Sequence, residues 1–110
     1  MKPIPKNLLI HSAELYTVVT DRWGAETETL TAELNGVRVE PARQVNISGD
    51  NREAKWEAVL YYDCVNSAPN GVTFSPEQVV KHGGKRYRVI GAQPYSDTRG
   101  VHHWEVQLHG

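Results

Sequence analysis

The sequence holds a single cysteine, Cys64, in 110 residues. One cysteine excludes an intramolecular disulfide and every zinc motif that is built from several cysteines. No apolar run approaches the roughly 18 residues of a membrane span, and residues 1–9 hold two prolines and too short an apolar stretch for a secretory signal. These absences predict a soluble protein that is made in the cytoplasm.

The sequence also lacks an excess of charge of either sign. It has 12 Lys and Arg residues and 13 Asp and Glu residues, which gives a net charge of -1. The chain therefore has no overall positive field for nucleic acid or an acidic membrane, and any such contact must be local. What the sequence does contain is an ordinary globular composition with 39% hydrophobic residues. This length and composition predict one domain, residues 1–110, with one core.

Alternation of apolar and polar residues predicts strands in the second half of the chain. The clearest strand covers residues 56–64, where every second residue is apolar. Residues 103–109 alternate in the same way. Residues 78–81 and 85–90 flank Gly83-Gly84, and glycines tolerate the positive φ angles of a two-residue hairpin turn. We therefore expect a hairpin there.

The first half is patterned less strongly. Residues 8–19 fit a helical face about as well as a strand, but the β-branched run at 16–20 favours a strand. A further strand is predicted over roughly residues 30–40, with a bulge at Asn35-Gly36. Residues 75–78 have the pattern of a helix start, Ser-Pro-Glu-Gln, that is too short for more than one turn.

About six strands with at most one short helical turn predict a mainly β fold, a small antiparallel barrel or sandwich. Residues 1–7 hold Pro3 and Pro5 and are expected to form an extended N-terminal segment. Residues 42–55 are almost entirely polar, which predicts a long polar loop. A connection of that length without core residues is usually functional or mobile.

The side chains that could carry chemistry match no known catalytic or metal-binding pattern. His102 and His103 would point to opposite faces of a strand, so they could hold one metal ion only at a bulge. Cys64 lies on the apolar side of its predicted strand, which indicates a buried and inert thiol. The sequence holds no GxSxG, P-loop or GxGxxG motif. We therefore predict no catalytic residue, no metal and no cofactor.

One local positive cluster is present around the predicted Gly83-Gly84 turn. It consists of Lys81, Lys85, Arg86 and Arg88. With Tyr87 among them, these cations could contact a nucleic-acid backbone, as in small barrels that bind single strands. Solvated hairpin cations are the alternative interpretation.

Several segments together carry a resemblance to a known family. They are Lys-Pro-Ile-Pro-Lys at 2–6, Leu-Leu-Ile-His-Ser at 8–12, Val-Arg-Val-Glu-Pro at 37–41, a Gly-Lys-x-Tyr-x-Val hairpin within 74–89, and His-His-Trp-Glu-Val-Gln-Leu at 102–108. In this order and spacing, the chain resembles the minor capsid proteins of tailed bacteriophages. That group is related to the head-closure, or stopper, proteins of the head-to-tail joint.

The resemblance implies a structural virion protein of the neck and not an enzyme. Such a subunit would form a closed ring of six or twelve copies, help to retain packaged DNA and provide the surface to which the tail attaches. Its expected partners are other copies of itself, a portal-adaptor protein on the head side, a tail-terminator or tail-tube protein on the tail side, and viral DNA in the channel. A tail-terminator or tail-completion subunit is the alternative.

Two sets of residues are candidates for contacts with these partners. The candidate channel loop, which could also touch a neighbouring subunit, consists of Arg43, Gln44, Asn46, Asp50, Asn51, Arg52 and Lys55. The candidate subunit interface consists of Trp23, Val59, Tyr61 and His103.

Overall fold

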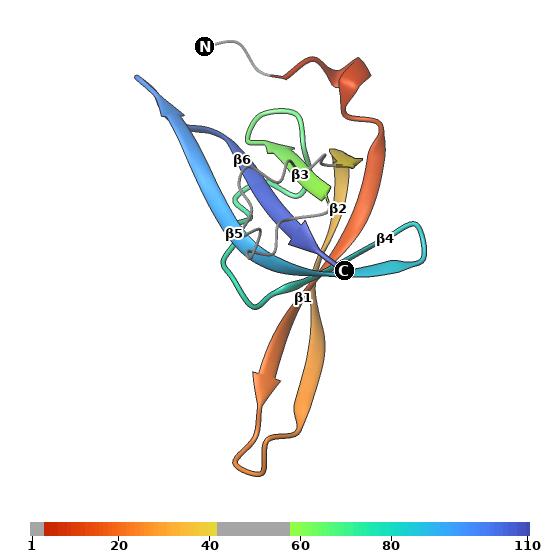
Figure 1. Ribbon diagram of the computed structural model, residues 1–110. Helices are drawn as coiled ribbons and strands as arrows, with labels where there is room; N and C mark the ends of the chain where they lie inside the picture. The colour runs from red at the N-terminus through yellow and green to blue at the C-terminus, as the bar shows by residue number, and fades with distance from the viewer. Residues whose placement is uncertain (1–3, 42–57) are drawn as a thin grey trace, which may run out of the picture.

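The computed structural model describes residues 4–41 and 58–110, which form six strands and one 3-10 turn (Figure 1). The elements are η1 (Lys6–Leu8), β1 (His11–Thr20), β2 (Glu26–Pro41), β3 (Ala58–Asp63), β4 (Val79–His82), β5 (Lys85–Asp97) and β6 (Gly100–His109). All pairs are antiparallel in the order β1-β2-β3-β6-β5-β4, and β4 pairs with β1 to close the sheet. The predicted mainly β fold is confirmed.

Strand β3 confirms the clearest of the predicted strands. Ala58, Leu60 and Tyr62 are buried, whereas Val59 and Tyr61 are half-buried on the outer face. This alternation follows from the two-residue period of a strand that has one face on a core. The start of the predicted strand, at residues 56 and 57, lies outside the described residues.

The end of β3 corrects the prediction in two ways. Asp63 falls on the outer side of the alternation, yet it is fully buried. The chain turns there, and the Asp63 carboxylate accepts hydrogen bonds from the backbone N–H groups of Val65 and Asn66 at 2.9 and 2.7 Å. Cys64 lies in this turn instead of in the strand and packs, partly buried, against the core.

The predicted hairpin at Gly83-Gly84 is also confirmed. It joins β4 to β5, and the two glycines have φ angles of 61° and 80°. Residues with a Cβ rarely adopt such angles, which is why the glycine pair specifies the turn. The short turn predicted before it is present as well, with the backbone N–H of Ser75 donating to the Gln78 side chain at 2.8 Å.

The first half of the chain forms one long hairpin, β1 with β2, so the strand interpretation is correct. Strand β2 begins at Glu26, earlier than predicted, because its first residues pair with the end of β1. The predicted bulge is present at Gly36: Ser12 pairs with Asn35 and His11 with Val37, which leaves Gly36 as the extra residue. Its φ of 68° suits glycine.

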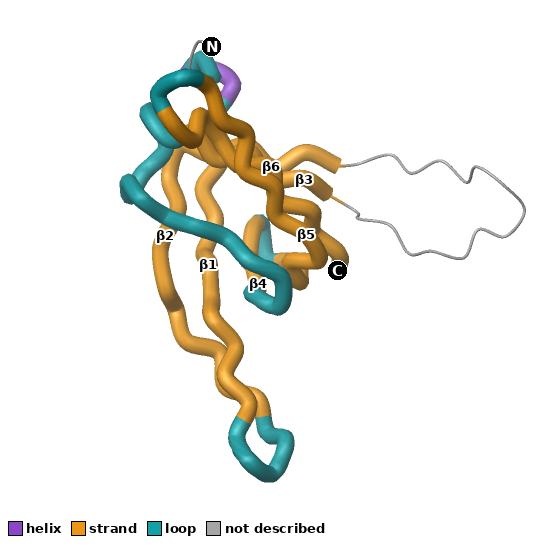
Figure 2. Tube along the Cα trace, turned by 90° about the vertical axis from the view of Figure 1, so that its left-hand side faces the viewer, coloured by secondary structure: helices purple, strands orange, loops and turns teal. Residues whose placement is uncertain are grey.

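The far half of this hairpin extends beyond the barrel. Strand β4 pairs with β1 only at residues 14–16, so residues 17–29 continue as two strands outside the closed sheet (Figures 1 and 2). A register shift between Leu15 and Tyr16 marks the base of this extension. We call residues 17–29 the arm.

The barrel interior is apolar, and the β3–β4 connection adds an aromatic side chain to it. Phe74 of that connection is buried, with its ring centroid 5.4 Å from that of Tyr62 and 5.6 Å from that of Trp104. The other core residues come from all six strands. They are Ala13, Leu15, Leu34, Val37, Val39, Ala58, Leu60, Val80, Val89, Val106 and Leu108.

The described part of the N-terminal segment is extended at Pro5, with φ -59° and ψ 139°, and turns after it. Lys6 and Asn7 lie in η1. The N–H groups of Leu8 and Leu9 donate to the carbonyls of Pro5 and Lys6, both at 3.0 Å. Proline has a fixed φ that is compatible with the start of such a turn. In the part of the chain that the structure describes, we find no helix with the length and hydrophobicity to span a bilayer.

Candidate functional site

The structure describes only some of the residues that the sequence suggested as contact sites. The candidate channel loop, from Arg43 to Lys55, lies outside the described residues. The candidate interface and the basic hairpin are both described. The interface candidates do not form one cluster, because Trp23 lies at the tip of the arm, whereas Val59, Tyr61 and His103 lie on the outer face of the barrel.

Tyr61 and His103 line an open groove of about 380 Å³ on the outside of the barrel. Strand β2 lies on one side of β3 and strand β6 on the other, and both contribute side chains. The remaining lining residues are Ile4, Leu8, Arg38, Glu40 and Glu105. We call this feature the outer groove. Most of the surface that these residues present to it belongs to apolar atoms.

The polar side chains of the outer groove contact one another and their neighbours, which fixes their positions. His103 Nε2 lies 3.1 Å from Glu105 Oε2, and its ring stacks on Tyr95 with centroids 4.9 Å apart. Arg38 Nε donates to Glu40 Oε2 at 2.7 Å. Burial, together with the carboxylates of Glu105 and Glu40, raises the pKa of Tyr61. The groove thus combines aromatic faces with two carboxylates.

The tip of the arm is held by its own hydrogen bonds. Asp21 Oδ1 accepts from the N–H groups of Trp23 and Ala25 at 2.8 and 2.9 Å, and the N–H of Gly24 donates to the Asp21 carbonyl. This fixed turn leaves the Trp23 side chain 79% exposed, with the Arg22 guanidinium 4.8 Å from its ring centroid. Asp21 and Gly24, three residues apart, are the sequence signal for such a turn.

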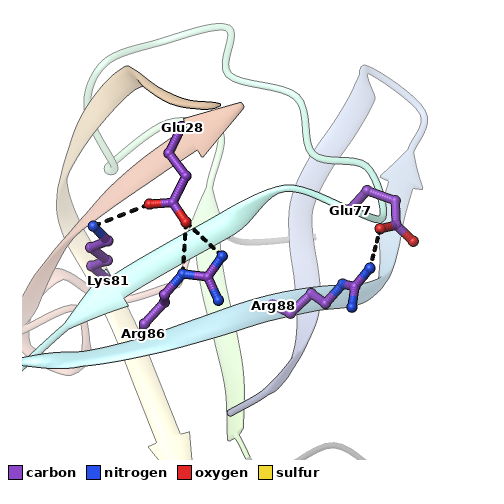
Figure 3. Close-up of polar contacts among 5 residues, drawn as sticks. All are labelled: Glu28, Glu77, Lys81, Arg86 and Arg88. Carbon is purple, nitrogen blue, oxygen red and sulfur yellow. Dashed lines mark hydrogen bonds and ion pairs between the residues drawn. The ribbon is translucent and has the colours of Figure 1, made fainter. Parts of the chain in front are cut away.

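The basic hairpin is paired with acidic side chains from other parts of the chain (Figure 3). Glu28 on the arm accepts a hydrogen bond from Arg86 Nε at 2.8 Å and lies 3.3 Å from Lys81 Nζ. Hydrogen bonds from Arg86 and Lys81 hold the pKa of Glu28 below its usual value. Arg88 donates to Glu77 at 2.6 Å. Two carboxylates, Glu28 and Glu77, thus pair with Lys81, Arg86 and Arg88.

Two cations of the basic hairpin also lie over aromatic rings. Lys81 Nζ lies 4.4 Å from the ring centroid of Tyr16, and Lys85 Nζ lies 5.2 Å from that of Tyr87. A cation held over a ring keeps its charge but gives up part of its freedom to reorient. Tyr87, which the sequence suggested as a stacking platform for a base, is instead in contact with Lys85 and packs partly against the core.

The histidines form two separate pairs. A register shift places a bulge at His102, so that His102 and His103 approach each other, with their Nδ1 atoms 2.7 Å apart, and do not face opposite sides as expected of a regular strand. His11 and His82 form the second pair, with ring centroids 4.9 Å apart. Within residues 4–41 and 58–110, no three His, Cys, Asp or Glu side chains are grouped as metal ligands.

Comparison with known proteins links this architecture to one family. A family model described as minor capsid protein matches residues 5–108, nearly the whole chain. No match is found among curated proteins or solved structures.

Proposed function

This chain belongs to the minor capsid protein family of bacteriophages and is a structural protein of the virion, and we propose that it is a ring-forming subunit of the neck. In this role it closes the head after DNA packaging and presents the surface to which the tail attaches. The geometric observation that carries the proposal is the arm with Trp23 exposed at its tip.

The arm is better suited to an assembly than to an isolated subunit. Burying a tryptophan removes about 150–250 Å² from water. At about 25 cal/mol per Å², this area corresponds to roughly 4–6 kcal/mol as an upper estimate. The isolated chain gains only a minor part of this energy, because Trp23 is 79% exposed. A neighbouring subunit that covers the tip would gain the rest.

The outer face of the barrel offers further apolar area to neighbours. Exposed or half-buried apolar side chains there include Val59 and Tyr61 of β3 and, at the outer groove, Ile4 and Leu8. Clusters of exposed apolar side chains are typical of surfaces that bind other proteins. In the proposed neck, these surfaces contact other copies in the ring of six or twelve, a portal-adaptor protein above and a tail protein below.

The alternative of a small nucleic-acid-binding barrel has less support. Such proteins bind through cations that can release the counterions of the phosphate backbone. Here Lys81 and Arg86 pair with Glu28, and Arg88 pairs with Glu77. A near-neutral wall next to DNA is consistent with a channel through which the genome must pass. Viral DNA is therefore proposed as cargo of the ring and not as a tightly bound ligand.

Reconstitution with tailless particles tests the proposal. Purified protein is mixed with DNA-filled, tailless capsids, and the portal vertex is imaged at a resolution that counts subunits. We expect a ring of density below the portal that fits this chain. Density confined to isolated tails would instead assign the chain to the tail terminator, and an empty vertex with binding to free single-stranded DNA would favour the nucleic-acid alternative.

A further inference from the structure

We propose that adjacent subunits of the ring are joined by insertion of Trp23, at the tip of one arm, into the outer groove of the next copy. The inference rests on the proposed ring and identifies the contact that would hold it together. The occupant of the groove is thus a second copy of this chain.

The groove has the size and the chemistry to receive an indole ring. Its volume of about 380 Å³ falls within the roughly 300–1,000 Å³ of pockets that bind small molecules. Ile4 and Leu8 provide apolar contacts. Tyr61 and His103 provide rings against which an indole can stack or lie edge to face.

Charge complements this apolar fit. Arg22 accompanies Trp23 at the tip, and the groove is lined by two carboxylates, Glu40 and Glu105, against the single guanidinium of Arg38. Both carboxylates already have a partner inside the groove, but a carboxylate has about four acceptor positions and can accept an additional arginine. Tryptophan and arginine are also the residues most often found at interface hot spots.

The placement of the two surfaces points to a contact between copies. The arm extends from one end of the barrel, and η1, which contains the groove residue Leu8, lies at the opposite end in both views (Figures 1 and 2). A tip directed away from its own groove can enter only the groove of another molecule. Because the two surfaces differ, copies joined in one direction make head-to-tail contacts, which form a closed ring when the rotation between copies closes.

The tip is already shaped for this contact. The hydrogen bonds of Asp21 to the backbone of Trp23 and Ala25 fix the turn before binding. A preformed turn loses little conformational freedom on association, so more of the contact energy appears as affinity.

Cross-linking between engineered cysteines tests the geometry directly. In a Cys64→Ser background, Arg22→Cys marks the tip and Leu8→Cys marks the groove, and all variants are assembled into virions of the phage that encodes the chain. We expect mild oxidation to give a ladder of covalent oligomers when both cysteines are in one chain. Arg22→Cys alone and Leu8→Cys alone are the matched controls, and neither should give more than traces of dimer.

An affinity measurement supplies an independent readout. The concentration of protein that half-saturates tailless capsids should rise at least about 30-fold for Trp23→Ala, the loss expected for an interface hot spot. Val65→Ala, which trims another well-exposed apolar side chain, is the control and should change it by less than about threefold. Circular dichroism and thermal unfolding of both variants should match those of the unmodified chain, because both sites are exposed.

The outcomes separate this inference from the proposed function. A tip-to-groove ladder in virions supports the inference. A ring that is present in virions but gives no ladder, or that tolerates Trp23→Ala, overturns the arm-in-groove contact and leaves the neck role standing. Absence of the chain from the neck overturns the proposed function and the inference together.

Discussion

Glu28 and Arg86 form an ion pair between the arm and the barrel, with Arg86 Nε 2.8 Å from Glu28 Oε2. Lys81 lies against the other carboxylate oxygen at 3.3 Å. One acidic side chain thereby connects the arm to both strands of the β4–β5 hairpin (Figure 3). The pair holds the arm against the hairpin, and the Glu28 charge offsets one of the positive charges there.

Replacing Glu28 by glutamine should therefore uncover a nucleic-acid contact. With Lys81 and Arg86 no longer compensated, we expect tighter binding to double-stranded DNA at low salt and a steeper loss of binding as salt increases. Fluorescence anisotropy at two salt concentrations measures both effects. Glu40→Gln on the same strand, where the carboxylate pairs with Arg38 and not with the hairpin, changes the net charge equally and is the control. An equal gain in both variants would show that net charge matters and the Glu28 pairing does not.

His11 should make folding stability depend on pH near neutrality. Its Nδ1 accepts a hydrogen bond from the Val39 N–H at 3.0 Å, and burial, His82 and Arg38 lower its pKa below the usual value near 6.5. Because the fold favours the neutral ring, this contribution is fully present above about pH 6.5 and is lost as pH falls through the lowered pKa.

The substitution His11→Asn isolates this effect, because an amide oxygen can accept the Val39 hydrogen bond without titrating. Urea unfolding between pH 7.5 and 5 should show a smaller loss of stability on acidification for His11→Asn than for the unmodified chain. Identical slopes for the His11 variant and the unmodified chain would contradict the assignment.

Gly36→Ala should destabilise the fold at the bulge of β2. The alanine would have to adopt a φ of 68°, and its Cβ would lie 3.1 Å from the backbone oxygen of Asn66. We expect a loss of about 2 kcal/mol in the free energy of unfolding. Gly71→Ala has a similar φ of 80° with nothing within 4 Å of the added atom, so it should cost only about 1 kcal/mol. Equal losses would mean that the contact with Asn66 has no effect.

Asp63→Ala should be among the most destabilising single substitutions in the described chain. The buried carboxylate accepts hydrogen bonds from the backbone N–H groups of Ile4, Val65 and Asn66, at 2.9, 2.9 and 2.7 Å. Its removal leaves three donors without their acceptor, which we expect to lower the free energy of unfolding by about 3 kcal/mol. Chemical denaturation measures this loss.

Asp21→Ala provides the matched control for Asp63. The Asp21 carboxylate also accepts hydrogen bonds from two backbone N–H groups. It is exposed at the tip of the arm, where water can replace it as the acceptor. We expect a loss of about 1 kcal/mol or less. If both variants lost the same amount, burial of the Asp63 carboxylate would not be the reason for its effect.

The sequence by itself determined the strands and turns that depend on neighbouring residues. The alternation along β3 sets which of its side chains face the core, and the pair Gly83-Gly84 sets a turn, because both properties follow from local backbone geometry. Gly36 likewise identified the bulge in β2. The number of such strands and the need to cover their edges predicted a barrel or a sandwich, and the pairing of β4 with β1 in the structure shows the closed form.

Tertiary structure decided what depends on residues that are far apart in the chain. Asp63 is buried because its carboxylate meets the backbone of Ile4, 59 residues away, and His102 meets His103 only because β6 bulges against β5. The outer groove needs side chains from the N-terminal segment and from β2, β3 and β6. The alternation along a strand indicates which of its faces is apolar. It does not indicate which distant strand lies beside it, so these contacts could not be predicted from the pattern.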